Sequence, residues 1–143
     1  MKKIIIVTIS VLILSSCSTF TITKESLVQQ LNENQNIAKT NNILSLGNEY
    51  YSNNLQKIKC TDKDGKEVYL YTAKNMNFII TKTSTGKNVN LYFDTVYFKN
   101  DTLFGLKSRI LGGKRNISIK EVSKIVIKTE TKRFDNVTVN IKK

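Results

Sequence analysis

The chain of 143 residues contains no histidine. Catalytic triads of the Ser-His-Asp and Cys-His types, and most zinc sites built from histidine and cysteine, therefore cannot form. Proline and tryptophan are absent as well, whereas Lys, Asn and Ile are abundant. Genomes of low GC content produce such a bias without any functional cause, so the composition excludes these chemistries and does not point to another.

Apolar runs long enough to cross a membrane are also missing. The N-terminal run, residues 4–14, has 11 residues, whereas a membrane-spanning helix needs about 20. Lys2 and Lys3 precede this run, and the small residues Ser15 and Ser16 follow it. A basic start, a short apolar run and small residues are the layout of a secretory signal peptide, which predicts export from the cytoplasm.

Residues 14–17 read Leu-Ser-Ser-Cys, and this motif resembles the lipobox of bacterial lipoproteins. In that family the cysteine thiol, here that of Cys17, receives a diacylglyceryl group, and cleavage makes this cysteine the first residue of the mature chain. The resemblance implies a lipoprotein that acyl chains hold at a membrane. Enteric lipoproteins of the inner membrane have aspartate where this chain has Ser18, so the outer membrane of a Gram-negative bacterium is favoured. An ordinary signal peptide with an incidental cysteine is the alternative.

Removal of residues 1–16 leaves 127 of the 143 residues, a length consistent with one domain. Lys2 and Lys3 leave with the signal, so 21 of the 23 basic residues remain against 11 acidic ones. The excess lies mainly in residues 107–143, which hold 11 basic and three acidic residues. Export removes the chain from the cytoplasm, so we expect no nucleic-acid partner despite this charge.

Two hydrophobic periods divide the rest of the chain. Leu27, Val28 and Leu31 have the spacing of one side of a short helix. From Leu55 onward apolar and polar residues alternate between turn signals, which predicts six or seven short strands. We therefore divide the chain into a lipoprotein signal peptide (1–16), a lipidated N-terminus with a short helix and a polar linker (17–54), a β-rich domain (55–128) and a basic C-terminal tail (129–143).

Closely spaced hairpins favour a mainly β fold, because a small antiparallel barrel or a sandwich hides its strand edges. We expect such a barrel or sandwich behind the short N-terminal helix. Residues 117–127, ISIKEVSKIVI, resemble the last strand pair and turn of small SH3-like barrels. Residues 53–115 also resemble small, uncharacterised lipoproteins of the Bacteroidota, which implies a family and no activity.

Residues 62–67, DKDGKE, begin like a calcium-binding loop. Such a loop needs oxygen ligands at its fifth and twelfth positions, where this chain has Lys66 and Ala73. We interpret the segment as a hairpin turn, and we predict neither a metal nor a cofactor. Cys60 is the one thiol left when Cys17 is acylated; it is either a small apolar core residue or a free thiol that pairs with a partner.

The most distinctive segment is residues 105–115, GLKSRILGGKR, in which four basic residues surround a glycine pair: Lys107, Arg109, Lys114 and Arg115. In a hairpin we expect them to form one exposed basic ridge close to the anchor. An envelope protein or an anionic lipid headgroup would bind there, with roughly 1 kcal/mol for each basic residue near an anionic surface. The alternative is a solvated strand edge whose charge prevents pairing with other strands.

The sequence therefore predicts a non-enzymatic, membrane-anchored lipoprotein of the cell envelope whose β-domain binds a protein or another envelope component. No constellation of catalytic residues stands out. The alternative is a small ligand-binding barrel or an inhibitor lipoprotein. A cavity large enough to enclose a ligand would favour that alternative.

Overall fold

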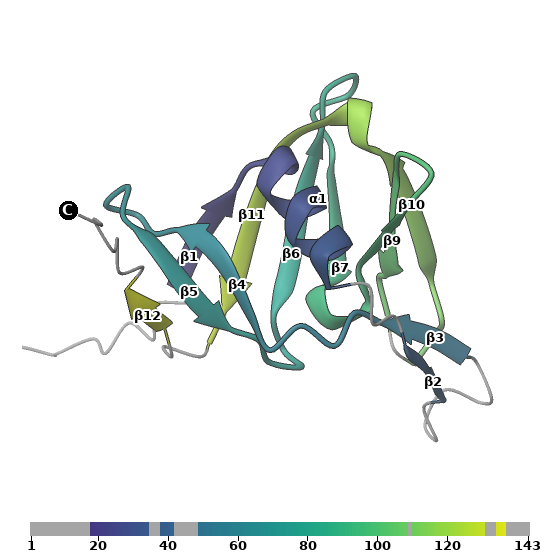
Figure 1. Cartoon of the computed structure of the whole chain (residues 1–143). Helices are drawn as coiled ribbons and strands as arrows, with labels where there is room; N and C mark the ends of the chain where they lie inside the picture. Colours follow the sequence, from purple (N-terminus) through teal and green to yellow (C-terminus); the bar gives the residue numbers. More distant parts are fainter. Residues whose placement is uncertain (1–17, 35–37, 42–48, 109, 131–133, 137–143) are drawn as a thin grey trace, which may run out of the picture.

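A computed structural model describes residues 18–34, 38–41, 49–108, 110–130 and 134–136. Within these ranges the chain folds mainly into antiparallel strands, together with the helix α1 (Lys24–Glu33) and two short 3₁₀ turns, η1 (Phe93–Thr95) and η2 (Ile119–Glu121) (Figure 1). The mainly β fold and the short N-terminal helix expected from the sequence are confirmed.

The largest sheet has seven strands in the order β12-β5-β4-β1-β11-β6-β7. Its strands are β1 (Ser18–Ile22), β4 (Lys57–Thr61), β5 (Glu67–Tyr71), β6 (Asn77–Lys82), β7 (Asn88–Tyr92), β11 (Val122–Thr129) and β12 (Phe134–Asn136). Apolar and polar residues alternate along most of these strands, so the sheet has one apolar face. In β11, for example, Ile125 and Ile127 are buried, whereas Lys124 and Lys128 are exposed.

A smaller sheet has three strands in the order β10-β9-β8: β8 (Tyr97–Lys99), β9 (Thr102–Leu106) and β10 (Lys114–Ser118). A separate hairpin consists of β2 (Ala38–Asn41) and β3 (Glu49–Ser52). Figure 1 shows the small sheet and this hairpin together at one end of the molecule, beyond β7. The fold thus has two distinct ends, one formed by the small sheet and the other by β5 and β12.

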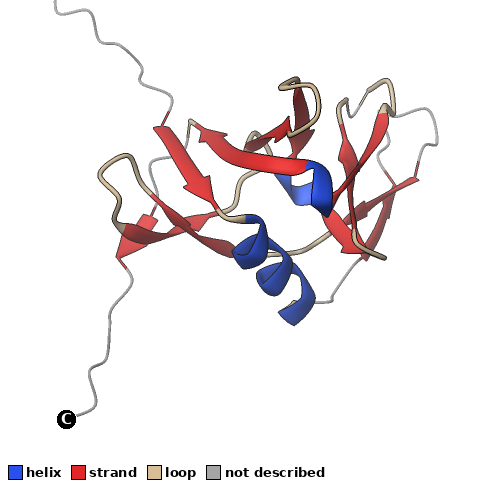
Figure 2. Ribbon diagram, turned by 90° about the horizontal axis from the view of Figure 1, so that it is seen from above, coloured by secondary structure: helices blue, strands red, loops and turns tan. Residues whose placement is uncertain are grey.

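The helix α1 covers part of the large sheet's apolar face. Thr23 caps the helix, since its Oγ1 accepts a hydrogen bond from the Ser26 N–H at 3.2 Å. Leu27 and Leu31 are buried, and the helix contacts β4 and β11 of the large sheet and β8 of the small one. Figure 2 shows α1 on one side of the strands. The apolar side of the helix, which carries Leu27 and Leu31 one turn apart, therefore packs against both sheets.

A glutamine fastens this helix to the sheet. β1 pairs with β4 at Thr21 and Thr61, and farther along β4 the helix supplies the hydrogen-bond partners. Gln30 Nε2 donates to the Lys59 carbonyl at 2.9 Å, and the Lys59 N–H donates to Gln30 Oε1 at 2.7 Å. The side-chain amide thus takes the place of a neighbouring strand, which leaves no unsatisfied backbone group there.

The interior is packed with side chains. Twenty buried apolar residues form one cluster, to which the large sheet, α1 and the small sheet all contribute. Phe78 and Phe93 lie at its centre, with ring centroids 4.7 Å apart. A core of this kind is that of one domain, in which both sheets share the same apolar interior.

Asn53 fixes the chain between β3 and β4. Its side chain is buried, and its Nδ2 donates to the carbonyls of Phe93 at 2.8 Å and Val96 at 2.9 Å. Its Oδ1 accepts from the Leu55 N–H at 3.1 Å. These bonds satisfy the polar groups of the η1 turn and hold the end of β3 beside the small sheet.

Two features differ from the sequence-based expectation. The expectation of a closed barrel is wrong, because both sheets are open: the edge strands are β12 and β7 in the large sheet and β10 and β8 in the small one. Residues 117–127 do form a strand, a 3₁₀ turn and a strand, but β10 and β11 belong to different sheets. The second difference is the number of strands: the described residues contain eight, β4 to β11, where six or seven were expected, and β1, β2, β3 and β12 lie outside that range. Of these, β1 lies in the middle of the large sheet. The division of the chain into four segments stays a prediction.

The two sheets meet closely at Gly105, and we predict that Gly105→Ala lowers the free energy of unfolding by about 1–3 kcal/mol, as overpacking typically does. A Cβ at this position would lie 3.0 Å from Leu91 Cδ1 and 3.3 Å from Val96 Cγ2. Urea denaturation measures the change. Gly113→Ala is the matched control, because its Cβ would lie 3.7 Å from its nearest neighbour, Lys107 Cβ. Equal stability of the two variants would contradict this packing.

Candidate functional site

The hairpin of β9 and β10 carries the basic segment that the sequence singles out. Its register pairs Leu106 with Lys114 and Gly105 with Arg115. Beyond these pairs, the Lys107 N–H donates to the Gly113 carbonyl at 2.8 Å. Gly112 has a φ of 63°, a conformation that glycine adopts at little cost. The glycine pair therefore closes the hairpin, as the sequence indicates.

Three of the four basic residues lie within the described part of the chain, and all three are exposed: Lys107, Lys114 and Arg115. Arg109 lies outside the described residues. Side chains alternate across a strand, so the register places Arg115 on the face of Gly105 and Lys107, and Lys114 on the opposite face with Leu106. Lys107 and Arg115 thus share one face of the hairpin and Lys114 lies on the other, and the single ridge of four basic residues stays a prediction.

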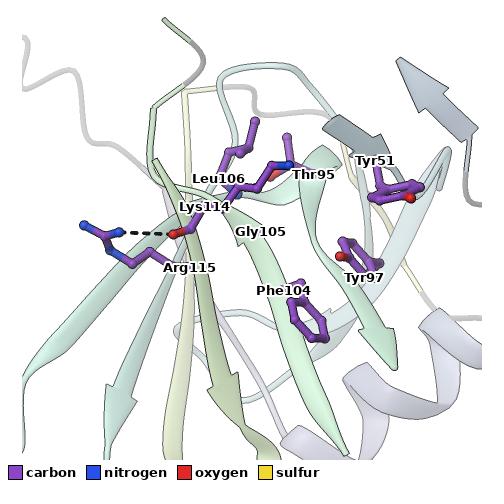
Figure 3. A pocket seen from close by; sticks show the side chains of 8 residues that line it. All are labelled: Tyr51, Thr95, Tyr97, Phe104, Gly105, Leu106, Lys114 and Arg115. Carbon is purple, nitrogen blue, oxygen red and sulfur yellow. Dashed lines mark hydrogen bonds between the residues drawn. The ribbon is translucent and has the colours of Figure 1, made fainter. Parts of the chain in front are cut away.

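Figure 3 shows how Lys114 and Arg115 diverge. The Lys114 side chain lies on the side of Leu106 and Thr95, whereas Arg115 extends the other way and its Nη1 donates to the Lys114 carbonyl at 3.1 Å. Thr95 is buried and links the hairpin to η1, because its Oγ1 accepts from the Leu106 N–H at 2.9 Å. This bond holds β9, the strand paired with the one that carries Lys114 and Arg115, against η1.

An aromatic row lies beside Lys114. Tyr97 of β8 stacks on Phe104 of β9, with centroids 5.0 Å apart and planes at 10°, and Tyr51 of β3 meets the edge of Tyr97 at 5.2 Å. Burial, and to a smaller extent Tyr51, raises the pKa of Tyr97. These rings and Lys114 line a shallow pocket of about 50 Å³, which holds a few water molecules at most. Sequence reasoning missed this row, because its members come from three separate strands.

The turn of the hairpin presents two apolar side chains to solvent. Ile110 is 68% exposed and Leu111 is 84% exposed. The Leu111 N–H donates to Ser108 Oγ at 3.1 Å, which shapes the turn. With Tyr51, these are the large hydrophobic residues classed as exposed in the part of the chain that the structure describes. The sequence signal was an Ile-Leu pair next to a glycine pair in a turn, a place where apolar residues cannot reach the core.

The β9–β10 hairpin belongs to the small sheet at one end of the molecule, whereas β1 lies in the middle of the large sheet (Figure 1). β11 and β6 separate β1 from β7 in the sheet order, which amounts to about 14 Å at a strand spacing of about 4.8 Å. Cys17, the predicted lipidation site, lies outside the described residues, but it directly precedes Ser18 at the start of β1. The expectation that the basic residues lie close to the anchor therefore stays a prediction.

Cys60 is a buried residue of β4 and belongs to the core cluster. Burial, with a smaller contribution from Asp62, raises the pKa of its thiol to about 12. The thiolate is the reactive form of cysteine, so this thiol is inert at neutral pH in the folded chain. Of the two interpretations of Cys60, the small core residue is confirmed.

The segment that resembles a calcium loop is the turn between β4 and β5. Gly65 has a φ of 80°, and Asp62 Oδ1 accepts from the N–H groups of Asp64 and Lys66, both at 2.9 Å. The Asp62 carboxylate thus stabilises the turn, and the hairpin interpretation is confirmed. Among the described residues, no three His, Cys, Asp or Glu side chains come together as a metal site.

Comparison of the chain with protein families, with characterised proteins and with solved structures finds no match. No helix in the described ranges is both long enough and apolar enough to cross a bilayer. The function must therefore be argued from the surface itself, where basic, aromatic and apolar side chains gather at the end of the molecule that carries the β9–β10 hairpin.

Proposed function

We propose that this protein is a non-enzymatic lipoprotein of the cell envelope, anchored through Cys17 in the outer membrane, whose β-domain binds an anionic envelope component through the β9–β10 hairpin. The observation that carries the proposal is the grouping of exposed basic residues around this hairpin, Lys107, Lys114 and Arg115. The partner's anionic group is a lipid headgroup phosphate or an acidic protein surface.

The charge of the hairpin supports this proposal. Residues 102–120 contain no Asp or Glu, so no acidic side chain within the small sheet neutralises the basic ones. Its backbone is held by the β9–β10 register and by Thr95. A rigid, uncompensated group of cations attracts anionic partners over about one Debye length, roughly 8 Å at physiological salt.

The alternative, a barrel or inhibitor lipoprotein that encloses a ligand, has less support. Enclosure requires an interior cavity, whereas both sheets here are open and their shared interior is filled by the core cluster. We infer that the two sheets act as a sandwich-like frame that displays the hairpin. The pocket beside the aromatic row is too small to hold more than a side group of a ligand. Two larger hollows, of about 230 Å³ between α1 and β8 and about 500 Å³ beside β1 and β11, are open to solvent and do not enclose a ligand.

Substitution of all four basic residues by Gln tests the proposal: Lys107, Arg109, Lys114 and Arg115. We expect binding to lipopolysaccharide and to phosphatidylglycerol vesicles to fall by up to about 1,000-fold, at about 1 kcal/mol for each charge. Rising salt should weaken wild-type binding in the same way.

A control variant removes the same charge elsewhere on the surface, by substitution of four exposed lysines: Lys63, Lys66, Lys87 and Lys128. This variant should retain most of the binding. Equal loss of binding in both variants would mean that net charge alone attracts the partner. Unchanged binding of the hairpin variant would mean that its four basic residues only form a solvated strand edge.

A further inference from the structure

The turn of the β9–β10 hairpin combines two kinds of side chain that a solvated strand edge does not need. Charge alone explains the basic residues, since a charged edge resists pairing. It does not explain Ile110 and Leu111, which are 68% and 84% exposed at the tip. Exposed apolar groups of this size are unfavourable in water. Two of them side by side in a turn indicate that another surface covers them when the protein is bound.

The arrangement matches the two layers of a bilayer interface. Apolar side chains at such an interface enter the boundary of the acyl chains, while lysine and arginine reach the headgroup phosphates. Here Ile110 and Leu111 form the tip, and Lys107 and Lys114 stand at the base of the turn on opposite faces. Tyr51, 44% exposed near Lys114, adds an aromatic ring of the type enriched at this depth.

A protein partner fits this tip less well. A stable protein interface typically buries about 800 Å² on each side, whereas the apolar part of the tip consists of two side chains on a convex turn. A bilayer needs no complementary pocket, because lipids rearrange around a protruding group. The absence of acidic residues from positions 102–120 also suits an anionic lipid surface.

We propose that the β9–β10 hairpin inserts Ile110 and Leu111 into the interfacial region of an anionic bilayer, with the flanking basic residues on the lipid phosphates. This inference rests on the proposed function and names its partner as a lipid surface. The hairpin belongs to the small sheet, whereas the predicted anchor directly precedes β1 of the large sheet (Figure 1). The tip is therefore an attachment point separate from the predicted anchor.

The chain contains no tryptophan, so Leu111→Trp introduces a single reporter at the tip. The protein used is residues 18–143, which include every described element and omit the predicted signal and Cys17. With vesicles that contain phosphatidylglycerol, we expect the emission to shift to shorter wavelength and brominated acyl chains to quench it. Vesicles of phosphatidylcholine alone should produce neither effect.

Ser84→Trp is the matched control, because Ser84 lies exposed in the turn between β6 and β7, where the neighbouring Thr83 N–H bonds to the Glu121 carbonyl, beyond the end of β10 that is far from the tip. Its emission should not change with either vesicle. In a chain without tryptophan, Ile110→Ser with Leu111→Ser should weaken sedimentation with anionic vesicles by about 10- to 100-fold. Circular dichroism before the assay checks that each variant is folded.

The results separate this inference from the proposed function. Salt-dependent binding without an emission shift in the Leu111→Trp variant would overturn insertion and leave anionic binding intact. Equal insertion into neutral vesicles would overturn the role of the basic residues. If residues 18–143 without any substitution bound no vesicles, both the insertion and the lipid partner would be contradicted. The anchor is tested separately by labelling of Cys17.

Discussion

In growing bacteria we expect labelled palmitate to enter the wild-type chain and not the Cys17→Ser variant. This is the largest effect that we expect from one substitution, because the thiol of Cys17 is the only atom of the lipobox-like motif that can carry the diacylglyceryl group. Each CH₂ moved from water into hydrocarbon contributes about 0.8 kcal/mol, and two chains make attachment stable. Loss of the thiol should therefore also move the protein from the membrane fraction to the soluble fraction.

Cys60→Ser is the matched control for this experiment. It removes the other cysteine of the chain, whose thiol is buried and has a pKa raised to about 12. Labelling of this variant should equal that of the wild type. Label that persists in Cys17→Ser, or that is lost in Cys60→Ser, would contradict lipidation at Cys17.

Lipidation at Cys17 would couple the anchor directly to the fold. Ser18, the next residue, is the first residue of β1, and successive Cα atoms lie about 3.8 Å apart. No flexible spacer would separate the lipid from the large sheet. The domain would then be held close to the bilayer by one end of β1, while the β9–β10 hairpin lies in the small sheet, beyond β7 (Figure 1).

The local part of this fold could be predicted from the sequence. Alternation marked β4 and β5, Asp64-Gly65 marked the turn between them, and the spacing of Leu27 and Leu31 marked α1. β1 was missed although Phe20 and Ile22 alternate with threonines. Five residues after the predicted signal peptide give a weak local signal, and the strand exists because it pairs with β11, about 100 residues later in the chain.

The sheet arrangement could not be predicted in the same way. Alternation shows that a segment has one buried face, but not which strand lies beside it. The η2 turn between β10 and β11 looks in sequence like a corner of a barrel, yet it moves the chain from one sheet to the other. Closure depends on whether the last strands meet, and no short segment contains that information.

The candidate site was predicted in composition and not in geometry. The four basic residues were evident, but the face on which each lies depends on the register. A shift of one residue in the turn would exchange the two faces of the hairpin. The bond from the Lys107 N–H to the Gly113 carbonyl fixes the register. The exposure of Leu111 was not predicted, because it follows from the place of this residue in the turn.

Removal of β1 should abolish the fold. Residues 18–22 pair with β11 at five positions on one side and with β4 on the other, so their deletion divides the large sheet into β12-β5-β4 and β11-β6-β7. Phe20 and Ile22, both buried, are lost from the core at about 1.5–3 kcal/mol each. Together with the lost hydrogen bonds, this approaches the whole stability of a typical domain, about 5–15 kcal/mol. We expect residues 23–143 to show no cooperative thermal unfolding.

A deletion at the sheet edge is the first control. Residues 18–133 lack β12, which pairs with β5 alone, and should still unfold cooperatively at a lower midpoint. Two substitutions then test β1 without a deletion. Phe20→Ala should lower the free energy of unfolding by about 3–5 kcal/mol, whereas Thr19→Ala, on the exposed face of the same strand, should change it by about 0.5 kcal/mol or less. A cooperative transition of residues 23–143 near the midpoint of residues 18–143 would mean that β1 is not part of the stable sheet, and that an anchor at Cys17 would be joined to the domain by a flexible segment.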